Sequence, residues 1–172
     1  IEGGETKAGL DLLDALLQPR RPTSEEPNNV QSVTRLHSLE SALEDTLETL
    51  VRAEGGQAID VLEARLREAV IMEGEIRDRD PNAVVGPITT SIAGTDVTNQ
   101  TTTNFKTFLI QTHRKAVDYW IQEDPDDGAR AELLTRYLDD ITVFRRLGLY
   151  VLKKHKDHYP DLVAEELGLF AE

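Results

Sequence analysis

The sequence contains no cysteine among its 172 residues. This absence excludes disulfide scaffolds, thiolate zinc sites and cysteine nucleophiles, and it is neutral about the compartment. The sequence also lacks any run approaching the roughly 20 apolar residues of a membrane span, and it has no leader of the signal-peptide type. We therefore expect no membrane association. A soluble intracellular protein and a subunit of an assembled particle both fit.

Basic residues are scarce, since 19 Lys and Arg residues face 32 Asp and Glu residues, a formal net charge of -13. A field of this sign repels nucleic acid and anionic membranes unless basic residues are gathered locally. The charge is uneven, with -5 over residues 30–79 and only -1 over residues 129–172. Copies of such a chain can associate by setting a less acidic surface against a more acidic one.

Signatures of catalysis and of cofactor binding are absent as well. No nucleophile elbow, phosphate-binding loop or dinucleotide glycine pattern occurs. The stretch 124–128 departs from a calcium loop, because its twelfth position falls on Leu134 or Thr135 and not on a bidentate acid. His155 and His158 stand beside lysines that oppose a bound cation. We predict that the protein is not an enzyme and holds neither a cofactor nor a metal ion.

Two amphipathic helices joined by a tight turn dominate the pattern between Val33 and Arg79. Glycines at 55 and 56 interrupt the apolar spacing and allow the chain to reverse. Such a pair packs antiparallel and needs further helices to cover its apolar stripes. The outer faces carry three acid-first pairs four residues apart, at Glu48 and Arg52, Glu63 and Arg67, and Glu75 and Arg79. The stripes consist of Val33, Leu36, Leu39, Leu43, Leu47 and Leu50, then Ile59, Leu62, Leu66, Ala69, Val70 and Ile76.

Further helices are predicted after a long connection. One covers about residues 105–122, with Thr103 or Asn104 as its N-cap. A second covers about residues 129–156, in which Gly148 marks a kink, a break or a close helix crossing. A short last helix begins at Pro160, a residue suited to the first helical position, and ends near Gly168. The fold class is therefore all-α, an antiparallel helical bundle.

Residues 1–29 read as an N-terminal arm, with a short amphipathic helix from Gly9 to Gln18 and a proline-rich linker. So short a helix is marginal alone and must dock, either on its own bundle or on another copy. We interpret it as an arm that lies on another subunit. Residues 30–172 then form one bundle, with a threonine-rich insertion of irregular or short β structure at 80–104. The docking anchor is predicted to be Leu10, Leu13, Leu16 and Leu17.

These features favour a non-enzymatic structural or assembly protein that self-associates into a homo-oligomer through its arm and helix faces, as a filament, coat or scaffold subunit does. The first alternative is a helical adaptor that holds a partner protein's helix in a groove beside Trp120. The second alternative is a coat protein that packages nucleic acid. Its contact residues are the one basic cluster of the sequence, namely Arg145, Arg146, Lys153, Lys154 and Lys156.

Overall fold

The computed structural model confirms the all-α class. It describes residues 2–21, 30–79, 104–124 and 128–169, and these contain seven helices and one pair of two-residue strands. They divide into two compact units. Unit 1 holds everything up to α3 together with α4 as far as Trp120, and unit 2 holds the end of α4 from Ile121 with the remaining helices. The elements are α1 (Glu2–Leu16), β1 (Pro19–Arg20), β2 (Gln31–Ser32), α2 (Leu36–Glu54), α3 (Gly56–Arg79), α4 (Phe105–Glu123), α5 (Gly128–Leu138), α6 (Thr142–Lys154) and α7 (Pro160–Leu169).

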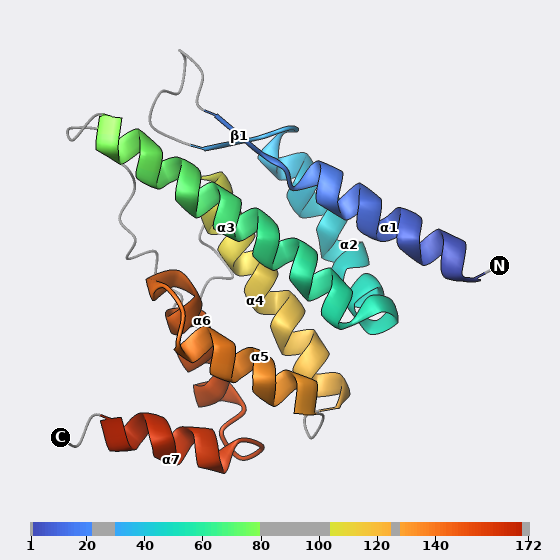
Figure 1. Ribbon diagram of the computed structural model, residues 1–172. Helices are drawn as coiled ribbons and strands as arrows, with labels where there is room; N and C mark the ends of the chain where they lie inside the picture. The colour runs from blue at the N-terminus through green and yellow to red at the C-terminus, as the bar shows by residue number, and fades with distance from the viewer. Residues whose placement is uncertain (1, 22–29, 80–103, 125–127, 170–172) are drawn as a thin grey trace. The chain divides into compact units, whose positions relative to one another are not determined.

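The predicted pair of helices joined by a tight turn is present in unit 1 as α2 and α3. Helix α2 ends at Glu54 and α3 begins at Gly56, so one residue, Gly55, makes the turn. Its φ of 48° lies in the region that glycine adopts most easily, and its N–H donates to the Val51 carbonyl at 2.7 Å. Helix α3 then runs back in the direction opposite to α2 (Figure 1).

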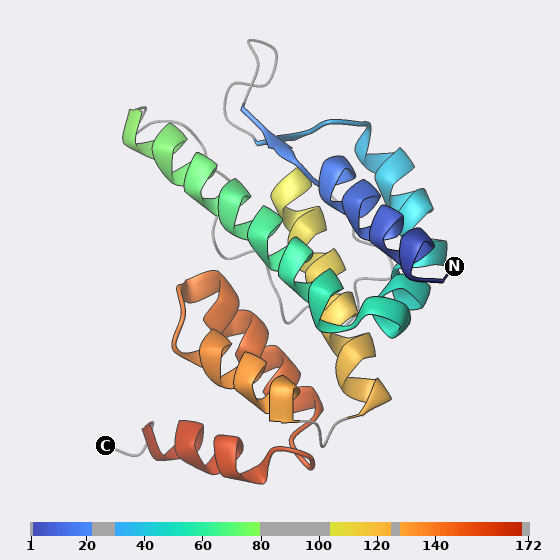
Figure 2. The same ribbon diagram turned by 45° about the vertical axis from the view of Figure 1, so that its right-hand side comes forward.

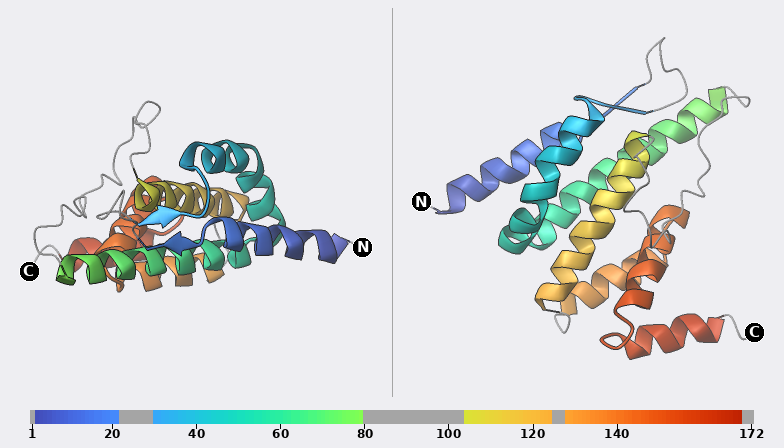
Figure 3. Two further views of the ribbon diagram at one scale, coloured as in Figure 1. Left: turned by 90° about the horizontal axis from the view of Figure 1, so that it is seen from above. Right: turned by 180° about the vertical axis from the view of Figure 1, so that it is seen from behind.

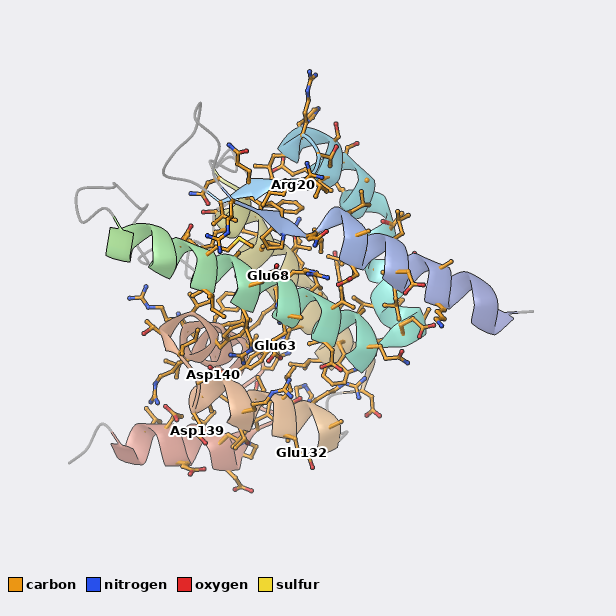
Figure 4. All side chains as sticks on the ribbon, turned by 45° about the horizontal axis from the view of Figure 1, so that its top comes forward. Arg20, Glu63, Glu68, Glu132, Asp139 and Asp140 are labelled. Carbon is orange, nitrogen blue, oxygen red and sulfur yellow. The ribbon has the colours of Figure 1, made fainter. Side chains whose placement is uncertain are left out.

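Two of the three predicted ion pairs on these helices are confirmed. Arg52 Nη2 lies 2.8 Å from Glu48 Oε1, and Arg67 Nη2 lies 2.8 Å from Glu63 Oε1. Glu63 is marked on α3 in Figure 4. The pair Glu75 and Arg79 lies outside the side chains that the structure describes.

The position of α1 differs from the predicted arm outside the bundle. Helix α1 begins at Glu2, earlier than expected, and packs against both α2 and α3 within unit 1. Figures 1 and 3 show α1 beside α3 in one layer, with α2 and α4 in a second layer. Helix α1 therefore covers part of the apolar stripes of α2 and α3 in the same chain. The predicted division into an arm at 1–29 and a bundle at 30–172 does not coincide with the two compact units.

The proline-rich linker begins and ends in a short pairing that the sequence pattern did not predict. Pro19 pairs with Ser32 and Arg20 with Gln31 in an antiparallel ladder. Figure 4 marks Arg20 on β1. This ladder connects the chain leaving α1 to the chain entering α2. The predicted threonine-rich insertion at 80–104, apart from its last residue, lies outside the described residues, as does the middle of the linker.

Helix α4 begins as predicted. The Asn104 Oδ1 accepts a hydrogen bond from the Thr107 backbone N–H at 2.9 Å, which satisfies one of the donors left open at a helix N-terminus. Of the two predicted N-cap residues, Thr103 and Asn104, it is Asn104 that caps the helix.

Unit 2 replaces the single predicted helix 129–156 by two helices that fold back on each other (Figure 2). The break lies at residues 139–141, not at Gly148. The Ile141 N–H donates to Asp140 Oδ1 at 2.6 Å, and Figure 4 marks both Asp139 and Asp140 in this connection. Gly148 is instead the close crossing, because a Cβ there would lie 3.1 Å from Tyr137 Cβ on α5. The final helix, α7, begins at Pro160 as predicted.

None of the described helices combines the length and the apolar character that a membrane-spanning helix requires.

Candidate functional site

The leucines predicted to anchor the chain to another copy face two different ways. Leu13 and Leu17 are 2% and 0% exposed, so the interior of their own unit already covers them. Leu10 and Leu16 are half-buried. Gly9 lies in the same contact, since a Cβ there would lie 3.3 Å from Leu50 on α2. The inner face of α1 is therefore part of the core of unit 1.

A bidentate ion pair holds α1 in this place. Arg65 on α3 donates from Nε to Asp14 Oδ1 at 2.8 Å and from Nη2 to Asp14 Oδ2 at 2.6 Å. Its Nη1 donates to Glu68 Oε2 at 2.6 Å, and Figure 4 marks Glu68 on α3. The hydrogen bonds to Asp14 are the main reason that the pKa of Arg65 is raised above its ordinary value, against the lowering effect of partial burial. Two parallel N–H to oxygen hydrogen bonds between a guanidinium and a carboxylate fix the relative orientation of the two side chains.

The opposite face of α1 is open and mainly apolar. Ala8, Asp11, Leu12 and Ala15 recur at the i, i+3, i+4 and i+7 spacing that places residues on one face, and all four are exposed. Leu12 is 59% exposed, and it is one of the few large apolar side chains in that state among the described residues. We call this surface, formed by Ala8, Asp11, Leu12 and Ala15, the open face of α1. Leu12 was not among the residues predicted to bind, although it lies outside the three-four spacing of its neighbours and could have been found on that ground.

Trp120, which was predicted to line a groove for a partner helix, lies in α4. Its side chain packs on the turn between α2 and α3. A Cβ on Gly55 would lie 3.0 Å from Trp120 Nε1, and one on Gly56 would lie 3.6 Å from Trp120 Cζ2. The indole of Trp120 therefore covers the reversal between α2 and α3. This contact gives Trp120 a role in closing the hairpin.

The predicted basic cluster divides into one residue that is bound within its own unit, Arg145, and four exposed ones. Arg145 donates to the Leu138 carbonyl at 2.9 Å and to Glu166 Oε2 at 3.0 Å, so it ties α6 to the end of α5 and to α7. The other members, Arg146, Lys153, Lys154 and Lys156, are exposed. Lys153 and Lys154 stand in the last turn of α6, where cations also interact favourably with the helix dipole.

A buried ion pair between α3 and α4 is a further feature that the sequence analysis did not find. Lys106 Nζ donates to Glu73 Oε2, and the two side chains are only 3% and 9% exposed. The first turns of α4 also carry the buried apolar side chains of Phe105, Phe108 and Leu109. The two charges are paired with each other, so the contact joins α3 to α4.

Metal chemistry finds no support in the part of the chain that the structure describes, where no group of three or more His, Asp or Glu side chains converges. The open face of α1 and the exposed basic residues of α6 are two surfaces that the described residues present to solvent.

Comparisons with known proteins found no matching family model, no similar curated protein and no similar solved structure.

Proposed function

We propose that this chain is a non-enzymatic assembly protein whose copies associate through the open face of α1. The observation that carries the proposal is that α1 is apolar on both sides. Its inner face holds Leu13 and Leu17, and its outer face holds Leu12 between Ala8 and Ala15. A helix with apolar residues on two opposite faces still exposes one of them after it has packed on its own unit. Within residues 8–17 only Asp11 and Asp14 are charged, and Arg65 engages Asp14.

This proposal keeps the assembly function predicted from the sequence and changes the residues that perform it. Leu13 and Leu17 contribute by holding α1 rigidly on its own unit, because they and the Arg65 pair fix the helix that presents Leu12. A rigid helix loses less conformational entropy on association than a flexible arm would. The proposed interface is therefore a preformed surface.

The test is the dissociation constant for self-association of the full chain, measured by sedimentation equilibrium. Replacing Leu12 by Glu should raise this constant at least about tenfold, since it places a charge where an apolar side chain would be buried. The matched control is Leu167→Glu. Leu167 is 64% exposed, close to the 59% of Leu12. It also lies on a helix with the same formal charge as α1, since α7 has three acidic residues and no basic one, a charge of -3.

The proposal is supported if Leu12→Glu weakens association and Leu167→Glu leaves it unchanged. It is overturned if the two variants behave alike or if the wild-type chain stays monomeric at the highest soluble concentration. Circular dichroism of both variants checks that the helices are intact.

A second candidate function is nucleic-acid binding through Arg146, Lys153, Lys154 and Lys156. Their shared exposure favours it, and the net charge of -13 opposes it. Binding of a labelled oligonucleotide that weakens steeply with salt would support it, and absence of binding at low salt would exclude it.

A further inference from the structure

Helix α3 exposes a second large apolar side chain in unit 1. Ile71 is 62% exposed, much as Leu12 is 59% exposed on α1. Asp60 and Ala64 on the same helix are exposed too, and Arg67 keeps 34% of its side chain exposed. These residues recur at the i, i+4, i+7 and i+11 spacing of one helix face. We call the surface formed by Asp60, Ala64, Arg67 and Ile71 the open face of α3.

The open faces of α1 and α3 lie on the same side of their layer. The two helices run side by side in the same direction, and α2 and α4 lie on one side of them (Figures 1 and 3). Each helix turns its buried leucines toward that side, Leu13 and Leu17 on α1 and Leu62 and Leu66 on α3. Since the open face of each helix is opposite to its buried face, the two open faces together form one outer surface of unit 1.

The exposed charges nearest to Leu12 and Ile71 differ in sign. The open face of α1 has one charged residue, Asp11, on a helix whose formal charge is -3. On α3, Arg67 lies one turn before Ile71 and pairs with Glu63, whose side chain is only 11% exposed. The arginine is the more exposed member of this pair, so α3 supplies a cation beside its exposed isoleucine.

Two acidic residues of α3 were weighed against this cation. Asp60 lies eleven residues before Ile71, or about 16 Å along the helix. Glu68 lies at the edge toward α1, where Arg65 already donates to it at 2.6 Å. Arg67 is therefore the exposed charge of this face that is both close to Ile71 and directed outward.

The remaining exposed large apolar side chains of the described residues stand beside acidic groups. Ile141 directly follows Asp139 and Asp140. Leu167 lies on α7, whose formal charge is -3. Either would bring like charges to Asp11, and a contact between two α1 helices would bring two Asp11 carboxylates together, which disfavours association. The open face of α3 is the described surface that best offers α1 both an apolar side chain and a cation.

We infer that two copies pair face to face, with Leu12 of each copy against Ile71 of the other and with Asp11 beside Arg67 of the other. A two-fold axis that passes between Leu12 and Ile71 relates the two halves, so the contact is isologous. This inference rests on the proposed self-association through the open face of α1 and names the surface that α1 contacts. An isologous contact is closed, so by itself it produces a dimer.

The substitution Ile71→Glu in the full chain tests the apolar half of the contact. It should raise the dissociation constant for self-association at least about tenfold, because it places a charge where an apolar side chain would be buried. The matched control is Ile141→Glu, the same substitution at an isoleucine that is 49% exposed in unit 2. If Ile71→Glu leaves the constant unchanged while Leu12→Glu raises it, the inference is overturned and self-association through α1 stands.

A charge exchange tests the polar half. Asp11→Lys and Arg67→Glu should each raise the dissociation constant about tenfold at low salt, since the two-fold axis repeats each substitution in the dimer. The chain with both substitutions should recover to within about threefold of wild type, because the charges are then exchanged and complementary again. The matched control is Arg52→Glu, since Arg52 also pairs with a glutamate four residues earlier and changes the net charge equally. A double variant that associates no better than the weaker single variant overturns the inference.

Disulfide cross-linking tests which residues meet, because the natural chain has no cysteine to interfere. Leu12→Cys and Ile71→Cys are prepared in separate samples, mixed and oxidised. We expect the mixed dimer in greater yield than the two homodimers combined. A chain with both substitutions should stop at a covalent dimer, whereas a ladder of larger species, or a mixed dimer no more abundant than the homodimers, overturns the isologous contact.

Sedimentation equilibrium of the wild-type chain separates the remaining occupants of this surface. An equilibrium between monomer and dimer supports the inference. A chain that stays monomeric at the highest soluble concentration overturns both the inference and the proposed self-association, since the surface is then covered by its own chain or by a different protein.

Discussion

Gly55 shows how one residue determines the course of the longest helices. Its φ of 48° and ψ of -117° suit glycine, and the indole of Trp120 fills the space where a side chain would begin. Both constraints act on the same atom, since a Cβ at Gly55 would be strained by the backbone and would also lie 3.0 Å from Trp120 Nε1.

Gly55→Ala should therefore lower the free energy of unfolding by about 1 to 3 kcal/mol, the usual cost of a strained backbone position. The neighbouring Gly56→Ala is the control, because a Cβ there meets Trp120 only at an ordinary 3.6 Å and Gly56 opens a regular helix. We expect Gly56→Ala to change stability by less than about 1 kcal/mol. Chemical denaturation of both variants measures the difference, and equal losses would refute this account of the turn.

The pair formed by Arg65 and Asp14 is a polar contact that joins α1 to α3. Arg65→Met should lower the free energy of unfolding by about 1 to 2 kcal/mol, as expected for a partly buried bidentate pair. Limited proteolysis should cut α1 sooner in this variant, because α1 then opens more easily. Arg52→Met is the control, since Arg52 pairs with Glu48 on its own helix and is 58% exposed.

The pH dependence of this contribution follows from the direction of the shift. A cation whose pKa is raised on folding stabilises the folded state at every pH below its ordinary pKa, and it loses that effect only as the pH rises through the raised value. Because the pKa of Arg65 is raised from an already high value, its protonation keeps the contribution constant from about pH 6 to about pH 9. A cost of Arg65→Met that fell between these two pH values would contradict this assignment.

At the scale of the elements, the helix pattern could be predicted and the partners of the helices could not. Three-four apolar spacing located α2, α3 and α4 to within a few residues, because that spacing reflects which side of a helix is buried, and Pro160 located the start of α7. It could not tell whether Leu13 and Leu17 meet their own chain or a copy, since burial looks the same in both cases.

The break between α5 and α6 was not predicted, because an interruption of the apolar pattern does not show whether a helix turns or packs closely there. Gly148 was the visible irregularity of the pattern, yet the chain turns at residues 139–141, where Asp140 accepts the Ile141 N–H. Gly148 interrupts the apolar spacing because α5 approaches too closely for a side chain there. A missing side chain in a periodic pattern thus indicated packing and not a change of direction.

The buried pair of Lys106 and Glu73 could not be predicted from the sequence, because charged side chains are ordinarily exposed to solvent. Lys106→Met should lower the free energy of unfolding by about 3 to 5 kcal/mol, since it leaves the Glu73 carboxylate buried without its cation. Combining Lys106→Met with Glu73→Leu should recover most of this loss, because two apolar side chains of similar volume replace the pair.

Thermal and chemical denaturation of the single and double variants distinguish the two cases. If the double variant is as unstable as Lys106→Met alone, the pair contributes more than the cancellation of two buried charges, and our account of it fails.

At the scale of the whole molecule, the distribution of charge matters more than its total. The chain has a net charge of -13, yet its one helix without acidic residues, among those described, has four basic ones. Two copies repel each other at a distance, and that repulsion is screened beyond about 10 Å at ordinary ionic strength. The association that we propose therefore depends on the local character of the open face of α1 and not on the total charge.

The most direct test of this account is the weight-average mass of the wild-type chain as a function of its concentration. We predict a rise from the 19.2 kDa of a single chain toward larger species as the concentration increases, because copies that associate through the open face of α1 obey mass action. A mass that stays at 19.2 kDa across the whole soluble range would contradict the proposal that the open face of α1 joins one copy to the next.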